Sequence, residues 1–234
     1  SRQAFISGKA AELAGFDLRR MIFAAAGAPS SEFLDRGYRL QLRGGSVVIR
    51  KGGIAHRWKI DRDLVGEGHF DPPTQPLDPN GQGKPYATYA FAAQLAQVEV
   101  DEALGTVKVL RIVAAHDVGR ALNPIQVEGQ IQGGALQGLG LALMEEYVPG
   151  KTENLHDYLI PTFAAAPRMD CILVEDPEPL GPSGAKGVGE PGLIPTAPAI
   201  LGAIDHATGV RMRQVPVLPH RLKAELDARP GRRA

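Results

Sequence analysis

Apolar and polar residues follow two spacings along this chain, and each spacing predicts a different kind of element. Residues 1–20 open with a short polar stretch and continue with apolar residues at helical spacing, which predicts a helix after a polar entry. Residues 37–60 alternate over short runs around Gly44 and Gly45, which predicts strands joined by a hairpin turn. Residues 65–85 are rich in glycine, proline and aspartate, so we expect a long ordered loop and an internal boundary there.

The second half mixes strand and helix patterns. Residues 86–100 are expected to pair with 107–115 in a β-hairpin around the turn at 101–106. The pattern further predicts a helix at about 124–146, a strand at 170–174, a helix at 195–207, an alternating strand at 210–217 and a last helix at 219–226. Hairpins and long helices are interleaved without a regular βαβ repeat. This order favours an α+β or mixed α/β fold and argues against a doubly wound nucleotide domain.

The predicted long helix is rich in glycine. Its glycines lie at 129, 133, 134, 138 and 140, and each would weaken a free helix by about 1 kcal/mol relative to alanine. We therefore expect the glycine face to pack closely against backbone or a flat ligand. Gln130 and Gln137 are two turns apart and can share one face, although Gln137 suits a solvated position equally well.

Composition narrows the classes of partner and compartment. The 234 residues allow one large or two modest domains, and 26 basic residues balance 26 acidic ones. Balanced charge gives no electrostatic case for nucleic acid or an anionic membrane, so small molecules are the expected ligands. The single cysteine, Cys171, excludes an internal disulfide and an iron-sulfur cluster held by this chain alone, and it fits a cytoplasmic location. No apolar stretch of roughly 18 residues and no signal pattern is present.

The stretch with the most candidate chemistry is GPSGAKGVGEPGLIPT at 181–196, which places one acid, Glu190, among glycines and prolines. GVGEPG at 187–192 matches GxGxxG, but no apolar strand precedes it and proline stands where that motif opens a helix. A P-loop is excluded because Lys186 is followed by Gly187 and not by a hydroxyl residue. The stretch is therefore either a surface turn cluster or a shaped loop that presents one carboxylate.

Other metal and nucleophile motifs are absent from the sequence. His116 and Asp117 are adjacent, and neighbours on an extended segment point in opposite directions. The remaining histidines show no HxxxH or HExxH spacing, and no serine lies in a GxSxG turn. We therefore expect neither a metal site ligated by protein side chains nor a serine nucleophile.

Three segments together resemble the molybdenum hydroxylases, the family of xanthine dehydrogenase and aldehyde oxidase. GAKGVGEPGLIPTAPAILGAI at 184–204 is similar to the C-terminal signature of that family. HDVGRALNPIQVEGQIQGGALQGLGLALMEE at 116–146 is similar to a second, cofactor-contacting segment, and SRQAFISGKAA at 1–11 to a third. The three occur in the family's order across almost the whole chain.

The resemblance implies that residues 1–234 form the second molybdenum-cofactor-binding region of the large subunit, as a split-gene subunit or a fragment. It implies that Glu190 is the catalytic base. It also implies cofactor contacts from Ser1, Arg2, Gln3, Gln130, Gly187, Val188 and Gly189. The implied cofactor is molybdopterin with molybdenum, in the cytosine dinucleotide form. Iron-sulfur clusters and FAD are expected on partner subunits, beside the remaining molybdopterin-binding part.

The implied reaction hydroxylates an electron-poor carbon of an N-heterocycle, a purine or an aldehyde with oxygen from water. Glu190 would act in it as the general base. The alternative is a non-catalytic cofactor-binding or assembly subunit in which the GVGEPG loop serves packing alone. Metal analysis of the purified complex, with and without this chain, would separate the two hypotheses.

Overall fold

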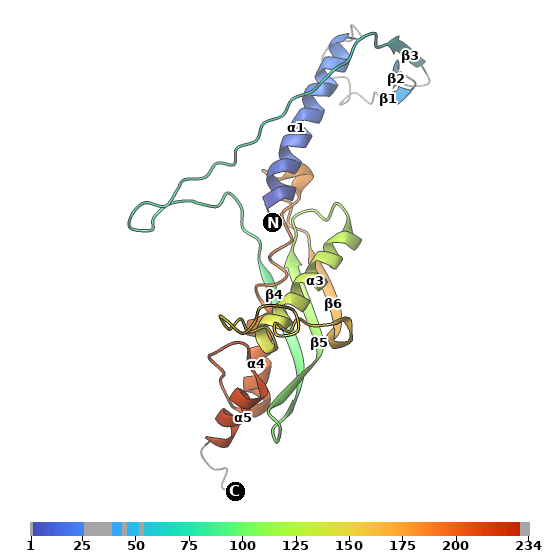
Figure 1. Ribbon diagram of the computed structural model, residues 1–234. Helices are drawn as coiled ribbons and strands as arrows, with labels where there is room; N and C mark the ends of the chain where they lie inside the picture. Colours follow the sequence, from blue (N-terminus) through green and yellow to red (C-terminus); the bar gives the residue numbers. More distant parts are fainter. Residues whose placement is uncertain (1, 26–38, 44–45, 52–53, 230–234) are drawn as a thin grey trace. The chain divides into compact units, whose positions relative to one another are not determined.

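The computed structural model describes residues 2–25, 39–43, 46–51 and 54–229 (Figure 1). Contacts divide the chain into two units, one of Arg2–Pro85 and one that runs from Tyr86 to the C-terminus. The second unit thus begins where the predicted loop at 65–85 ends. Each unit has a three-stranded sheet with helical structure, one α-helix in the described part of the first unit and three in that of the second, which confirms the predicted mixed α+β class.

In the first unit, helix α1 spans Arg2–Ala25 and therefore begins without the polar entry that the sequence suggested. Two glycines of the following loop lie against it. An added Cβ would stand 2.3 Å from the Ala14 carbonyl oxygen at Gly66, and 2.1 Å from the Ala10 carbonyl oxygen at Gly68. The first part of the predicted long loop is thus fixed by close backbone packing on the small-residue face of the helix.

The sheet of this unit is an antiparallel meander in the order β1-β2-β3. Its strands are β1 Arg39–Arg43, β2 Ser46–Lys51 and β3 Ile54–Lys59. Val47 and Ile49 on β2 are buried against Ile22 and Phe23 of α1, because alternate residues of a strand face the same side. The predicted turn at Gly44 and Gly45 lies outside the described residues.

The second unit contains a sheet of the order β4-β5-β6 and three helices. Its elements are β4 Ala92–Asp101, β5 Thr106–Asp117, α3 Pro124–Leu143, β6 Arg168–Val174, α4 Thr196–Thr208 and α5 Pro219–Asp227, with single 3-10 turns at Phe163–Ala165 and Pro182–Gly184. The β4–β5 hairpin was predicted. The parallel pairing of β5 with β6 was not, although a helix such as α3 is the usual crossover for such a pair.

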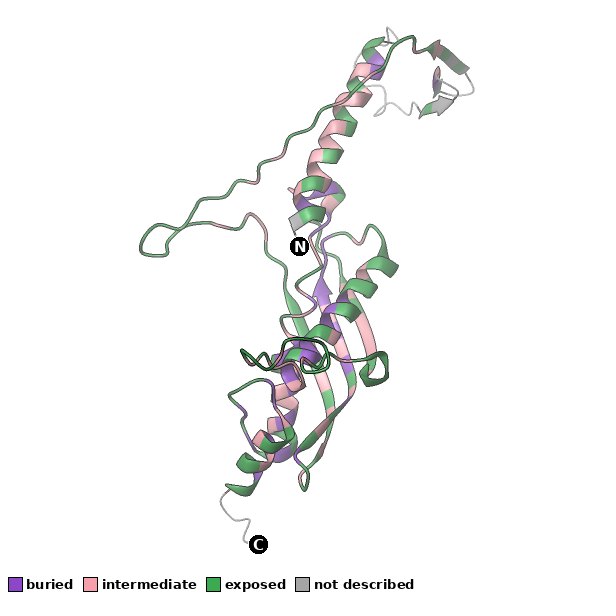
Figure 2. Cartoon of the chain, viewed as in Figure 1, coloured by how far each residue is buried: buried purple, intermediate pink, exposed green. Residues whose placement is uncertain are grey.

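The core of this unit lies between one face of the sheet and the three helices. Ile112 of β5, Ile131 of α3 and Ile200 of α4 have no exposed surface, and the last core layer comes from Leu222 and Leu226 of α5. Figure 2 shows buried residues along β5 and on α3. Helix α3 ends at Leu143, three residues before the predicted end.

The tip of the β4–β5 hairpin is held by residues from the far end of the unit. Gly105 has φ of +70° at the tip, and an added Cβ there would lie 2.2 Å from the Pro219 carbonyl oxygen at the start of α5. An Arg229 side-chain nitrogen lies 2.9 Å from a Glu102 carboxylate oxygen. The hairpin and the C-terminal helix therefore stabilise each other.

The predicted strand at 210–217 is wrong, because the structure has no strand there. Val210, Met212 and Val217 are nevertheless buried in the core, which explains the alternation in the sequence. The Val217 N–H donates to the Ala142 carbonyl at the end of α3 and not to a neighbouring strand. The apolar residues here are thus buried from an irregular segment, and not from a strand.

Candidate functional site

The loop at 181–195 is attached to the end of β5 by backbone contacts. The Gly184 carbonyl accepts hydrogen bonds from the N–H groups of Arg120 (2.7 Å) and Glu178 (3.0 Å). Gly119 forms an isolated β-bridge with Ala185. Its φ is +63°, and an added Cβ would lie only 2.5 Å from the Gly184 carbonyl oxygen. Glycine is required there, and the HDVGR and GAKG segments are direct neighbours.

A buried ion pair locks the same junction. The Lys186 Nζ donates to Asp117 Oδ2 at 2.6 Å, and both side chains are only 7% exposed. The other oxygen, Asp117 Oδ1, accepts the Gly119 N–H at 3.0 Å. Burial alone would raise the pKa of Asp117, but the bonds from Lys186 and Gly119 outweigh burial and hold that pKa below its ordinary value. Lys186 therefore stabilises the junction between the HDVGR and GAKG segments.

The second half of the loop is a turn that lies on the glycines of α3. The Leu193 N–H donates to the Glu190 carbonyl at 3.0 Å. An added Cβ at Gly134 would lie 3.0 Å from the Gly192 carbonyl carbon, and one at Gly138 would lie 2.4 Å from Thr196 Cβ. The expected close packing of the glycine face is confirmed at these two positions.

A partly buried polar network fixes this turn from the side of the sheet. The Gln94 Nε2 of β4 donates to the Gly192 carbonyl at 2.9 Å and lies 3.1 Å from His116 Nε2. The Thr196 hydroxyl donates to Gln94 Oε1 at 2.7 Å. His116 is 1% exposed, and burial lowers its pKa, so the ring is neutral at pH 7. Within the described part of the chain, His116 Nδ1 has no hydrogen-bond partner.

The structure brings some of the predicted site residues together. Glu190 and Gly189 are exposed, while Gly187 and Val188 are half-buried. The exposed Gln130 of α3 is a neighbour of this loop, because its carbonyl oxygen lies 3.3 Å from a Cβ added at Gly192.

The remaining predicted contacts belong elsewhere. Arg2 and Gln3 lie in the first turn of α1, in the other unit, and Ser1 is outside the described residues. The Gln3 Oε1 accepts a hydrogen bond from the Ser7 hydroxyl one turn later.

Sequence reasoning missed the residues that hold the loop in place. Gln94 carries no motif, and it lies 98 residues from Gly192 and 102 from Thr196 along the chain. His116 and Asp117 were considered only as metal ligands, and within 2–25, 39–43, 46–51 and 54–229 no cluster of three or more such side chains could hold a metal ion. The one available signal was that HDVG and GAKG each open a segment of the resemblance, which does not predict a contact between them.

The second unit is an α+β fold whose loop carries one acid, Glu190, beside the glycine-rich helix α3. The family model of the molybdopterin cofactor-binding domain matches residues 1–167. The chain therefore belongs to this family, which is that of the xanthine dehydrogenase and aldehyde oxidoreductase large subunits. Glu190 lies beyond the matched residues. No helix of the described residues is long and apolar enough to cross a membrane.

Similar proteins carry related descriptions. The xanthine dehydrogenase molybdenum-binding subunit of Escherichia coli O157:H7 is 40% identical over 142 residues, which covers 58% of this chain and 19% of that protein. The nicotine 6-hydroxylase large subunit of Paenarthrobacter nicotinovorans is 30% identical over 237 residues, or 95% of this chain and 28% of that protein. This chain thus spans less than a third of either relative.

A solved structure supports the fold. The aldehyde oxidoreductase from Desulfovibrio gigas superposes with a TM-score of 0.69 at 35% identity, and the match covers 72% of this chain and 19% of that structure.

Proposed function

We propose that this chain contributes the general base and part of the cofactor-binding surface of a molybdenum hydroxylase, with Glu190 as the base. The observation that best supports this role is the exposure of Glu190 on a turn with a fixed backbone. Leu193 holds the Glu190 carbonyl, and Gln94 holds the Gly192 carbonyl. A carboxylate on such a turn can accept a proton repeatedly from the same direction.

In the proposed reaction, a C–O bond to oxygen from water forms and a C–H bond breaks at an electron-poor carbon of an N-heterocycle, a purine or an aldehyde, so that two electrons and two protons are released from substrate and water. A carboxylate oxygen of Glu190 accepts the proton of the attacking oxygen and later releases it to solvent. When bound, the molybdenum cofactor supplies the centre that accepts the two electrons of the oxidation. His116 is neutral and Lys186 is paired with Asp117, so neither accepts a proton in this scheme. Both side chains instead help to hold the loop in place.

The cofactor is proposed to lie along the exposed surface of α3 beside the loop. Gln130 offers an amide, and residues 187–189 offer backbone that can approach a ligand closely. Gly133 has no atom within 4 Å of an added Cβ, and it lines a pocket of about 350 Å³ together with Gln137 and Leu193. Small residues, amides and an open pocket suit a flat pterin with many polar edges.

The first turn of α1 is proposed to contact the pyrophosphate of the same cofactor through Ser1, Arg2 and Gln3. Free N–H groups at a helix N-terminus attract anions, and the arginine adds positive charge. We propose molybdopterin cytosine dinucleotide as the bound form.

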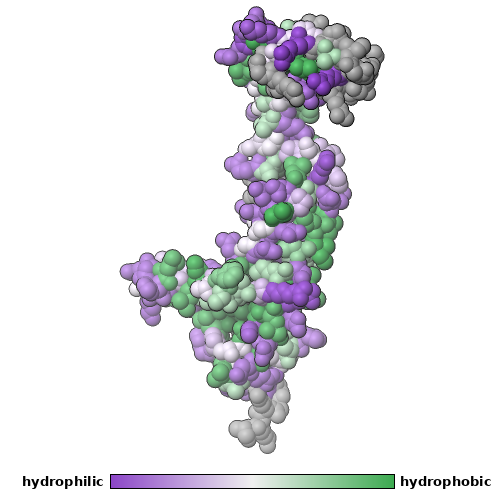
Figure 3. Space-filling model, turned by 90° about the vertical axis from the view of Figure 1, so that its right-hand side faces the viewer, coloured by the Kyte–Doolittle hydropathy of each residue, from purple (hydrophilic) through white to green (hydrophobic). Residues whose placement is uncertain are grey.

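The partners are proposed to be the remaining molybdopterin-binding part, an iron-sulfur subunit and an FAD subunit. The supporting observation is a surface with apolar areas, which Figure 3 shows on the second unit. Leu95 of β4 is 62% exposed and Ile172 of β6 is 51% exposed, on strands whose other face forms the core. Exposed apolar strand residues of this kind commonly cover a protein interface.

Replacing Glu190 with glutamine tests the catalytic role. The substitution keeps size and hydrogen-bonding capacity but removes the basic oxygen, so turnover of the assembled enzyme should fall by about 10² or more. The measurements are steady-state kinetics and metal content, because the variant should assemble and retain its molybdenum. Glu99→Gln is the matched control, since Glu99 is exposed on β4 and pairs in register with Lys108 away from the loop. Its turnover should equal that of the wild type.

If Glu190→Gln keeps more than about a tenth of wild-type turnover, the loss is too small for a general base. Glu190 would then be a packing or positioning residue, and the chain would fit the non-catalytic alternative. Loss of molybdenum from the Glu190→Gln enzyme would likewise contradict the assignment, because it would make cofactor retention the role of the residue.

A further inference from the structure

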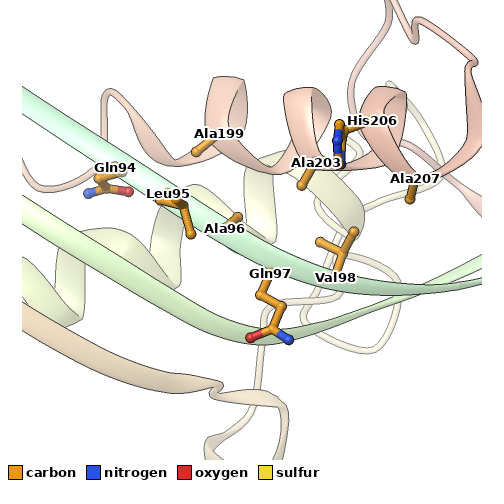
Figure 4. A pocket seen from close by; sticks show the side chains of 9 residues that line it. All are labelled: Gln94, Leu95, Ala96, Gln97, Val98, Ala199, Ala203, His206 and Ala207. Atoms are coloured by element: carbon orange, nitrogen blue, oxygen red, sulfur yellow. The ribbon is translucent and has the colours of Figure 1, made fainter.

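The side chain of Gln94 connects three segments that are remote in the sequence. It lies on the core side of β4, and through it β5, the turn at 189–192 and the start of α4 share one hydrogen-bond network. Figure 4 shows Gln94 at one end of a groove in which Ala199, Ala203 and Ala207 of α4 face β4. These alanines let the helix approach the strand closely enough for Thr196 to reach Gln94.

The partners of Gln94 determine the orientation of its amide. The Gly192 carbonyl can only accept, so the amide nitrogen must face it, and the amide oxygen then faces the Thr196 hydroxyl. The second N–H of the amide points to His116 Nε2 at 3.1 Å, which must be the unprotonated nitrogen of the ring. Only this orientation of the amide satisfies all three hydrogen bonds of Gln94.

We propose that Gln94 is a positioning residue for Glu190, which sets the turn at 189–192 through the Gly192 carbonyl, with His116 and Thr196 fixing its amide. This inference rests on the proposed function of Glu190. Gln94 acts on Glu190 indirectly. It holds the carbonyl of Gly192, two residues after Glu190 in the chain, and not the carboxylate itself. Its loss should therefore reduce the fraction of molecules in which Glu190 points correctly, while the binding of substrate changes little.

Two substitutions separate positioning from bulk packing. Gln94→Leu removes all three polar contacts, and we expect kcat to fall by about tenfold with KM within about twofold, since a misdirected base slows chemistry more than binding. Gln94→Glu keeps an oxygen for Thr196 but turns a second oxygen toward the Gly192 carbonyl. Relative to the wild type at the same pH, its kcat should be low at pH 8 and recover toward acid pH, because a protonated carboxyl can again donate to Gly192.

A structural readout accompanies the kinetics. Hydrogen–deuterium exchange of the peptide spanning 186–196, measured by mass spectrometry on the assembled enzyme, should become faster in Gln94→Leu. Gln97→Leu is the control, because Gln97 lies on the same strand and points to the opposite side from α4 in Figure 4. Both its kinetics and its exchange should match the wild type. Thr196→Val carries the test if Gln94→Leu does not assemble, because it removes the hydroxyl that donates to Gln94 Oε1 and that also lies 3.2 Å from the Gly192 carbonyl oxygen.

The outcomes distinguish this proposal from that for Glu190. Unchanged kcat and unchanged exchange in the Gln94 or Thr196 variants, in an enzyme that Glu190→Gln inactivates, would overturn the positioning role alone. Activity that survives Glu190→Gln would overturn the proposed function instead. A rise in KM as large as the expected fall in kcat, with kcat itself unchanged, would also contradict positioning, because it would place Gln94 in substrate binding.

Discussion

Lys186 and Asp117 form a buried ion pair at the site, and such a pair is costly to break from one side. Lys186→Met would leave the Asp117 carboxylate buried without its cation, and we expect the free energy of unfolding to fall by about 3–5 kcal/mol. Chemical denaturation of the purified subunit measures this. The double variant Asp117→Leu/Lys186→Met should recover much of the loss, since it buries no charge. A loss below about 1 kcal/mol in the single variant would mean that the pair behaves like a surface ion pair.

The same pair makes stability depend on pH in a defined direction. Because the folded state lowers the pKa of Asp117, the stabilisation is fully present above the ordinary value of 3.8 and is lost as the pH falls below it. At this scale the sequence singled out a candidate residue but did not predict the contacts that hold its loop. Glu190 could be singled out because it is one acid among glycines, whereas Gln94 could not, since its partners are about a hundred residues away.

Among the elements, the glycine-rich helix α3 could be predicted from sequence most completely. Its existence, its start at Pro124 and the close packing of its glycines follow from spacing and from the cost of glycine in a helix. The strand expected at 210–217 was wrong because alternation reports which side chains are buried and not whether another strand is available to pair. The parallel β5–β6 pair was missed because pairing between strands separated by a helix leaves no local pattern.

The packing of α3 gives a prediction for two helical glycines. Gly138→Ala places a Cβ 2.4 Å from Thr196 Cβ, so α4 must shift, and we expect a loss of about 1–3 kcal/mol from overpacking. Gly202→Ala on α4 is the control, because no atom lies within 4 Å of its added Cβ. It should be neutral or stabilise by up to about 1 kcal/mol. Thermal unfolding of both variants checks the difference. Equal melting temperatures would mean that α4 can shift without a loss of stability.

The whole molecule consists of two units whose connection is exposed. Residues 73–84 are all exposed, and they contain turns and a single β-bridge between Gln75 and Lys84. Limited proteolysis of the purified chain with subtilisin should therefore cut first within 73–84 and leave a resistant fragment that begins near Tyr86. N-terminal sequencing of that fragment is the measurement. First cleavage inside β4–α4 would show that the second unit does not hold together as described.

The closure of the β4–β5 hairpin by the C-terminal helix has a consequence for synthesis on the ribosome. The strands of the hairpin are translated early, but the contacts of Gly105 with Pro219 and of Glu102 with Arg229 require residues made more than a hundred codons later. Leu222 and Leu226, which complete the core, arrive equally late. The part of the apolar core that α5 covers must therefore remain open until the end of synthesis, and nascent chains of this unit are expected to be clients of chaperones that shield exposed apolar surface.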